Sequence, residues 1–373
     1  MPSLNGQMIL KVARDMKAFL NVEMGFTRGS APDPATIQRE LRRVQKRLQK
    51  RNRQVTRMRR ILQNKDRLIA RLRNGSLGAK SDDARAENII WIFGTGRSGS
   101  TWLMNMMANM PHTSSWNEPM VGRLFGEFYH DAQVGQRNAR GFILGEPARE
   151  GWMPLIREFV LGSIGYRFPR RGPKNFLIVK EPNASVGAPI IMEALPESRM
   201  ILLIRDPRDV VASMVDAMRK GSWLYERKDR GKQGKDSLSD RDPDAAVERR
   251  AQIYLRDVSN ARSAFEAHKG HKALVRYEDL RASTVDTLRR VYSALEIPLA
   301  DSDLEETVEK FRWESIPEEE KGRGKKFRKA TPGGWHEDLT PAQAKLVEQI
   351  TAPVLEEFYY ASTTESQELS SSP

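Results

Sequence analysis

Residues 89–110, IIWIFGTGRSGSTWLMNMMANM, are the stretch that decides the fold of this chain. The first five residues are apolar and mostly β-favouring, Gly94 and Gly96 interrupt the run, and apolar residues return at helical spacing from Leu103 to Met110. The stretch therefore predicts a strand, a glycine loop and a helix. Backbone N–H groups of such a loop, with the positive end of the helix behind it, form an anion site. A phosphate-type ligand is the first hypothesis.

The glycine loop departs from that of nucleotide triphosphatases. Their loop carries a Lys before its Ser or Thr, and this Lys reaches the β- and γ-phosphates. Gly94, Gly99 and Thr101 fit the pattern, but Ser100 stands in the Lys position. The cation of this loop is Arg97, three residues earlier, which suits an anion held deeper in the turn. A P-loop kinase or triphosphatase is therefore a disfavoured alternative, beside an ordinary glycine turn.

The composition limits the classes of protein. The 373 residues are 39% hydrophobic, enough for one large α/β domain plus an accessory region. The chain has no Cys, and its 5 His lack metal-ligand spacing, so we expect neither disulfides nor a bound metal. No apolar run is long enough to span a bilayer, and the N-terminus lacks a long apolar core. We therefore expect a soluble, cytoplasmic protein without a transmembrane segment.

The positive charge of the chain is concentrated near its amino terminus. Residues 36–73 hold 15 of the 62 Lys and Arg and 2 of the 49 Asp and Glu, so 47 basic and 47 acidic residues remain elsewhere. Apolar residues in this segment alternate at spacings of four and three, interrupted by Arg51 and Lys65, which predicts a coiled coil and a homodimer. Most of the positive charge faces away from the seam. It is therefore either a solvated face or a contact for a polyanion or an anionic membrane surface.

These patterns predict a domain order along the chain. The alternative to an enzyme is a scaffold protein whose basic coiled coil binds a polyanion and whose α/β domain is inactive. The expected segments are a short amphipathic helix at 1–29, a basic coiled coil at 30–73, a linker at 74–87, a catalytic domain at 88–362 and a disordered tail at 363–373.

Further strands end at polar residues. The buried runs at 176–179 and 200–204 are followed by Lys180 and Arg205, and another strand is predicted at 272–277. Alternating strands and helices predict an α/β fold with a parallel sheet covered on both faces. Because ligands collect at the carboxyl ends of such strands, we expect Arg97, Lys180 and Arg205 to converge on one crevice. Three cations indicate a ligand with more than one anionic group.

The segments between the strands are less regular. Residues 111–120 predict a loop that brings Glu118 back toward the glycine loop, and residues 121–172 a helix and loops. A mobile loop over the site is predicted at 222–242, and a basic, glycine-rich anion clamp near 321–335. Thr340 is expected to cap a helix that has Pro at its first position.

Taken together, the motifs resemble those of sulfotransferases that use 3'-phosphoadenosine 5'-phosphosulfate (PAPS), over roughly residues 88–360. In that family a strand-ending Arg and a Ser eight residues later bind the 3'-phosphate, and Arg205 and Ser213 keep this spacing. The segment 327–335 is similar to the family's R-K-G-x-x-G-D-W loop, although Ala330 and Gly334 depart from it. The resemblance implies donor-binding roles for Gly96, Arg97, Ser98, Gly99, Ser100, Thr101, Trp102, Arg205, Ser213, Tyr277, Arg328 and Lys329.

The resemblance also implies a catalytic arrangement. Cytosolic members carry a catalytic His after the second strand, where this chain has Lys180, Glu181 and Pro182. The chain is more similar to tyrosylprotein, carbohydrate-type and bacterial sulfotransferases, in some of which a Glu about 21 residues after the loop Arg is the base. Glu118 lies 21 residues after Arg97. This implies that Glu118 is the base, with Glu181 as its competitor, and that Lys180 and Arg97 stabilise charge.

The implied reaction moves a sulfuryl group from PAPS to an acceptor hydroxyl and leaves adenosine 3',5'-bisphosphate. No metal is implied. A glycan, a lipid headgroup, a protein tyrosine and a small alcohol all fit as acceptors.

Overall fold

The computed structural model describes part of the chain, namely residues 85–134, 142–169, 174–228, 241–325, 327–358 and 360. The chain divides into two units, and all of these residues lie in the second, Ser81–Pro373. The predicted amphipathic helix, coiled coil, most of the linker and the tail lie outside the described residues. They stay predictions.

The described strands and α-helices alternate along most of the chain. The strands are β1 (Ile89–Gly94), β2 (Thr113–Asn117), β3 (Phe176–Lys180), β4 (Arg199–Ile204) and β5 (Lys272–Arg276). The α-helices are α3 (Ser100–Asn109), α4 (Val121–Val134), α5 (Arg149–Arg167), α6 (Ala188–Ala194), α7 (Pro207–Met218), α8 (Trp223–Lys228), α10 (Pro243–Ala267), α11 (Tyr277–Ala282), α12 (Thr284–Ala294), α13 (Asp301–Lys310) and α14 (Pro341–Glu357).

The strands form one parallel sheet in the order β2-β3-β1-β4-β5. β1 is central, and each of its residues is buried. Its register places Trp91 beside Val179 of β3 on one side and beside Met200 of β4 on the other. Because every strand points the same way, the carboxyl ends of all of them meet at one edge, where α/β proteins bind ligands.

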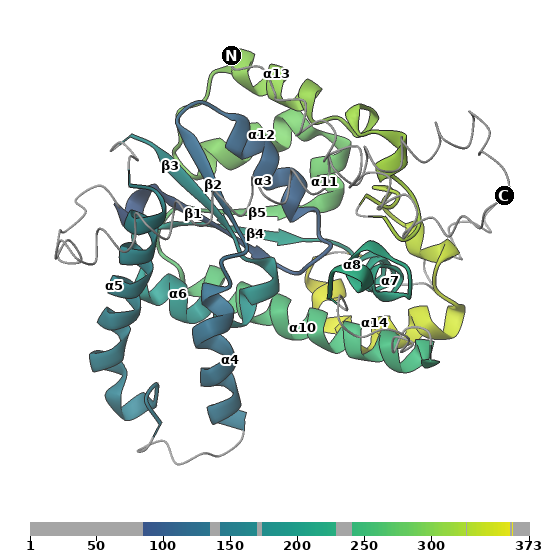
Figure 1. Cartoon of the computed structure of the whole chain (residues 1–373), viewed down its shortest axis with the longest axis horizontal. Helices are drawn as coiled ribbons and strands as arrows, with labels where there is room; N and C mark the ends of the chain where they lie inside the picture. Colours follow the sequence, from purple (N-terminus) through teal and green to yellow (C-terminus); the bar gives the residue numbers. More distant parts are fainter. Residues whose placement is uncertain are drawn as a thin grey trace, which may run out of the picture. The chain divides into compact units, whose positions relative to one another are not determined.

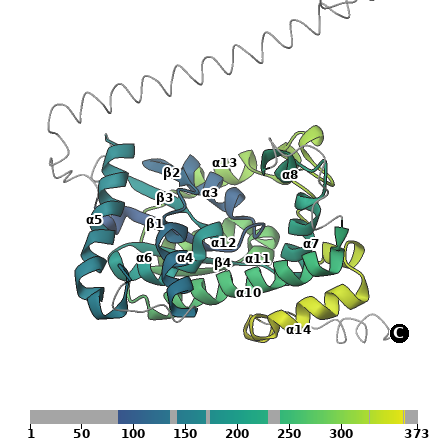
Figure 2. The same cartoon turned by 60° about the horizontal axis from the view of Figure 1, so that its bottom comes forward.

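Helices cover both faces of the sheet, as the sequence predicts (Figure 1). Trp91 and Phe93 of β1 face a core built with α5, α6 and α10. Ile90 and Ile92 face the opposite core, built with α3, α11, α12 and α13. α14 packs on α10, and the two helices run side by side in both views (Figures 1 and 2). The predicted α/β class with a parallel sheet is confirmed.

The strand β2 was missed by the sequence analysis, which predicts a loop there. Its sequence, TSSWN, is mostly polar because β2 is an edge strand that pairs only with β3 among the described strands. A half-exposed edge strand lacks the continuous apolar run that marks a strand buried on both faces.

Other boundaries also differ from the predictions. Residues 121–172, predicted to be a helix and loops, contain two long helices, α4 and α5. Part of the predicted mobile loop at 222–242 is also helical, as α8. Tyr277 begins α11 instead of ending β5. The predicted cap of α14 is confirmed, since Gln343 N donates to Thr340 Oγ1 at 3.2 Å and Thr340 N donates to Gln343 Oε1 at 3.1 Å. None of the described helices has the length and apolarity that a membrane crossing requires.

Candidate functional site

The glycine loop between β1 and α3 has the local conformation of an anion site. Gly99 has a φ of 90° and is followed by the first turn of α3. A Cβ at Gly99 would lie 2.5 Å from the ring of Tyr277, so only glycine fits here. Gly96 and Ser98 shape the loop from inside: a Cβ at Gly96 would lie 2.5 Å from Asn183 Oδ1, and the buried Ser98 Oγ donates to Thr95 O at 2.7 Å.

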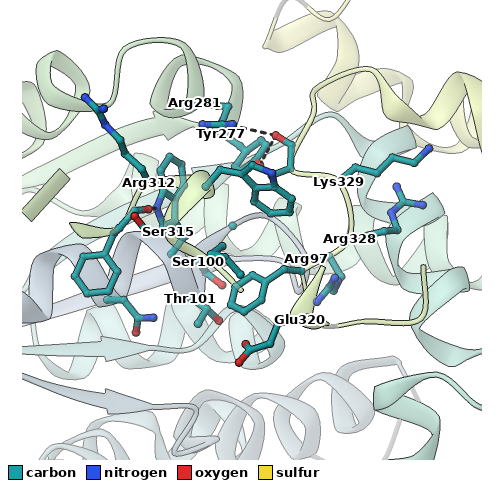
Figure 3. Close-up of a pocket in the computed structure, with 18 of the residues that line it drawn as sticks. Arg97, Ser100, Thr101, Tyr277, Arg281, Arg312, Ser315, Glu320, Arg328 and Lys329 are labelled. Atoms are coloured by element: carbon teal, nitrogen blue, oxygen red, sulfur yellow. Dashed lines mark hydrogen bonds between the residues drawn. The ribbon is translucent and has the colours of Figure 1, made fainter. Parts of the chain in front are cut away.

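A cavity of about 390 Å³ lies beside this loop, within the size range of small-molecule sites (Figure 3). It is bounded by the loop and α3, by α7 and α11, and by the segments 310–320 and 327–330. Its charge is strongly one-sided. Among its described lining residues seven are basic and one is acidic: Arg97, Arg205, Arg281, Lys310, Arg312, Arg328, Lys329 and Glu320. The cavity therefore favours a ligand with several negative charges.

Arginines meet at one end of the cavity. Arg97 Nε donates to Ser213 Oγ at 3.0 Å, and Arg205 Nη1 donates to Arg97 O at 3.2 Å. Burial, together with the positive charges of Arg205 and Arg328, lowers the pKa of Arg97 to about 10. Arg97 also has a φ of 72°, a costly conformation for a non-glycine residue that is common at functional sites. An anion bound here would reduce the electrostatic repulsion between Arg97, Arg205 and Arg328. Arg205 and Ser213, which lie eight residues apart in the sequence, both line this cavity and both form hydrogen bonds with Arg97.

Arg205 is held in place by its surroundings. Its guanidinium lies 4.3 Å from the centre of the Tyr277 ring, and its Nη2 lies 3.2 Å from Asp209 Oδ2. Among the described residues, no hydrogen-bond partner lies at its buried Nε. The fully buried Asp209 also accepts from Gly333 N and Trp335 N, both at 3.0 Å. Asp209 thus ties Arg205 to the turn at 333–335, a role that the sequence analysis missed. Arg205 precedes α7 and Asp209 lies in its first turn, so helical spacing gave no signal for this role.

The basic segment near the carboxyl end, predicted to be an anion clamp, forms part of the cavity wall. Arg328 and Lys329 line the cavity, and both form ion pairs with Asp338, at 2.8 and 3.2 Å. Tyr277 Oη and Arg281 Nε donate to Ala330 O at 3.1 and 3.2 Å (Figure 3). Ala330 has a φ of 53°, which explains why the resembling loops carry Gly at this position.

A second wall of the cavity was not predicted. The segment 310–317 lines it, and Trp102 Nε1 donates to Phe311 O at 2.8 Å. Trp102 and Tyr277 pack edge to face, with ring centroids 6.4 Å apart. Aromatic faces of this kind can hold a planar base. The segment follows α13 as short turns without a motif, so its sequence carried no signal.

Glu118 and Lys180 form a pair beside the cavity. Lys180 Nζ donates to Glu118 Oε1 at 2.8 Å and to Thr101 Oγ1 at 3.2 Å, and Asn183 Nδ2 donates to Glu118 Oε1 at 2.9 Å. Thr101 lines the cavity, whereas Lys180 and Glu118 do not. Of the three cations expected to converge, Arg97 and Arg205 line the cavity, and Lys180 contacts it through Thr101.

The neighbouring Glu181 has a different environment. Its side chain is fully buried, its Oε1 accepts from Val121 N at 3.0 Å, and burial raises its pKa to about 7. The Glu118 side chain is 23% exposed. Of these two carboxylates, only Glu118 is accessible to a substrate in this conformation. As for metals, the described residues contain no group of His, Asp or Glu that could hold one.

Comparisons with known proteins agree with the motifs. A protein-family model described as "Sulfotransferase family" matches residues 90–301, more than half of the chain. This confirms the resemblance seen in the sequence. No curated protein sequence matched the chain.

Several solved structures are similar at low identity. Sulfotransferase STF9 from Mycobacterium avium is 15% identical, with a TM-score of 0.49, over 76% of this chain and 80% of that chain. Mouse sulfotransferase SULT7A1, complexed with PAP, is 16% identical, with a TM-score of 0.43, over 74% and 86% of the two chains. The sulfotransferase domain of the Synechococcus PCC 7002 olefin synthase is 18% identical, with a TM-score of 0.43, over 73% and 94%. The family assignment rests on the family model and not on these likenesses.

Proposed function

The chain belongs to the sulfotransferase family, and from this premise we propose that it transfers a sulfuryl group from PAPS to an acceptor hydroxyl and releases adenosine 3',5'-bisphosphate. The observation that carries the choice of donor is the basic cavity at the glycine loop. PAPS carries a 5'-phosphosulfate and a separate 3'-phosphate. A cavity with an anion-binding loop and an arginine cluster suits a nucleotide with two anionic groups.

The residues of the cavity suggest how this donor is held. Backbone N–H groups from Gly99 to Thr101 would bind the phosphosulfate, as helix N-termini bind phosphate. Arg205 and Ser213 would bind the 3'-phosphate, while Trp102 and Tyr277 would pack on the adenine. We assign Arg328 and Lys329 to the clamp that closes over the nucleotide, and Gly96, Ser98 and Ser100 to the shape of the loop.

Transfer forms an oxygen–sulfur bond to the acceptor and breaks the sulfur–oxygen bond to the 5'-phosphate of the donor. In our proposal the Glu118 carboxylate takes the proton of the acceptor hydroxyl. The ammonium of Lys180 lies between Glu118 and Thr101, where it would stabilise the charge that develops during transfer, together with Arg97. In-line positioning and electrostatic stabilisation are the main demands of such a reaction.

A binding experiment tests the donor. We expect calorimetry with the full chain to give micromolar affinity for PAPS and for adenosine 3',5'-bisphosphate, and far weaker affinity for ATP, which lacks a 3'-phosphate. Turnover is then measured with labelled PAPS and a panel of glycans, lipids, tyrosine peptides and small alcohols. Tight ATP binding with ATP hydrolysis, and no binding of PAPS, would instead support the P-loop kinase or triphosphatase.

We also propose that the protein is a cytoplasmic homodimer assembled through residues 30–73. Support comes from the apolar a layer of the heptads: Leu41, Leu48, Val55, Leu62 and Ile69. The basic outer face of the same segment would contact a polyanion or an anionic membrane surface, with affinity that falls as salt rises.

Sedimentation tests the homodimer. We expect a dimer at tens of micromolar for the intact chain, and a monomer for Leu48→Lys with Leu62→Lys, because two Lys at seam positions would place charge in an apolar interface. Lys46→Ala, at an outer heptad position, is the matched control and should stay dimeric. A monomeric wild type would remove the proposal.

A further inference from the structure

Glu118 lies in a tightly specified turn between β2 and α4. Glu118 has a φ of 50° and Met120 a φ of 67°, so two non-glycine residues within three positions adopt the left-handed conformation. This conformation is unfavourable for a non-glycine residue, so the surrounding contacts must hold it. The direction of the Glu118 side chain therefore depends on what fixes this turn.

The two ends of the turn donate hydrogen bonds to two consecutive residues, Lys180 and Glu181. At its start, Glu118 N donates to the backbone oxygen of Lys180 at 2.9 Å. At its end, Val121 N, in the first residue of α4, donates to Glu181 Oε1 at 3.0 Å. The Glu181 backbone is itself fixed, because its N–H donates to Ile92 O of β1 at 2.9 Å. The turn is thus tied to the central strands.

Close packing reinforces this connection. A Cβ at Gly122 would lie 2.3 Å from Ala184 O, and a Cβ at Gly126 would lie 2.4 Å from Gly187 Cα. The start of α4 therefore rests directly on the backbone of the 3₁₀ segment Pro182–Gly187, which follows Glu181. The Glu181 side chain that accepts from Val121 N is itself fully buried.

We propose that Glu181 is a positioning residue, which fixes the turn at 118–121 through Val121 N–H and so holds Glu118 against Lys180 for proton abstraction. This inference rests on the proposed function, because it presupposes that Glu118 is the base. For this role the Glu181 side chain must be long enough to place an oxygen at Val121 N–H. It does not need a negative charge. A buried N–H that loses its acceptor is costly and would let the turn relax.

Two substitutions separate reach from charge. Glu181→Gln keeps an oxygen that can reach Val121 N–H and removes the charge, whereas Glu181→Asp keeps the charge and shortens the side chain by one methylene. We expect Glu181→Asp to lower kcat by about 5- to 150-fold, the equivalent of one broken buried hydrogen bond. Glu181→Gln should lose less than Glu181→Asp, and both should bind PAPS with wild-type affinity, because Glu181 does not line the cavity.

A double variant with Glu118→Gln gives a second test. Its result distinguishes positioning of Glu118 from a purely structural role of Glu181. In a Glu118→Gln background, Glu181→Asp should cause little further loss of kcat, because the group that it positions is already gone. Additive losses in the double variant would overturn the proposal. So would a Glu181→Gln variant that is less active than Glu181→Asp, the order expected if Glu181 were the base.

Hydrogen exchange at the Val121 amide tests its hydrogen bond to Glu181 in the absence of PAPS and of an acceptor substrate. Protection should persist in Glu181→Gln and be lost in Glu181→Asp. Equal protection in both variants would overturn the positioning role. If this pattern holds while the wild type shows no turnover with PAPS, the contact stands and the proposed function fails, so the two failures are distinguishable.

Discussion

Glu118→Gln is expected to lower turnover by about 10² to 10⁴, the usual cost of losing a general base. The amide has the shape of the carboxylate and can still accept from Lys180 Nζ and Asn183 Nδ2, so the local structure should persist. Donor affinity should change little, because Glu118 does not line the nucleotide cavity. Single-turnover kinetics with labelled PAPS and calorimetry with adenosine 3',5'-bisphosphate measure the two effects separately.

The matched control for this variant is Glu305→Gln on α13, which removes an exposed carboxylate away from the cavity lining. It should leave turnover at the wild-type level. Near-normal turnover in Glu118→Gln, with loss of turnover in Glu181→Gln, would reverse the assigned roles and contradict the 21-residue spacing from Arg97 on which the assignment began.

Arg205→Ala is expected to weaken PAPS binding by about 10- to 150-fold, since a charge-assisted hydrogen bond contributes about 1.5 to 3 kcal/mol. The effect should be specific to the 3'-phosphate. Adenosine 5'-phosphosulfate, which lacks that phosphate, should bind the wild type weakly, and Arg205→Ala should change its affinity little. Calorimetry with both ligands on both proteins completes the comparison.

Removal of an exposed arginine controls for net charge. Arg249→Ala on α10 makes the same charge change as Arg205→Ala, but Arg249 is exposed and does not line the cavity. It should bind PAPS like the wild type. If the wild type bound PAPS and adenosine 5'-phosphosulfate equally well, the assignment of Arg205 to a 3'-phosphate would be wrong.

The central strands and their polar ends could be predicted from the sequence because their signals are local. β1, β3 and β4 are buried on both faces, so each reads as an uninterrupted apolar run. The residue after such a run lies at the ligand-binding edge of a parallel sheet, which is why Arg205 could be assigned to the site. The pairing of Arg205 with Ser213 followed from the family resemblance, whose eight-residue spacing these two residues keep.

Elements without a local signal were missed. β2 is a polar edge strand, and the wall at 310–317 consists of short turns whose residues meet the cavity only through the packing of α13. Asp209 was not identified from the sequence. Its function as an anchor became visible only when Gly333 and Trp335, more than a hundred residues away, were seen to donate to it.

The sequence by itself determined the strand, loop and helix around Arg97, the parallel sheet and the family, because these depend on short-range periodicity and spacing. It favoured Glu118 only through the 21-residue spacing from Arg97 that the resemblance supplies, and it left Glu181, next to Lys180, as a competitor. Tertiary structure separated them by placing the start of α4 over Glu181, which buries that carboxylate, and by leaving Glu118 partly exposed beside Lys180. Burial and partner choice arise from contacts between segments about 60 residues apart, so no local pattern encodes them.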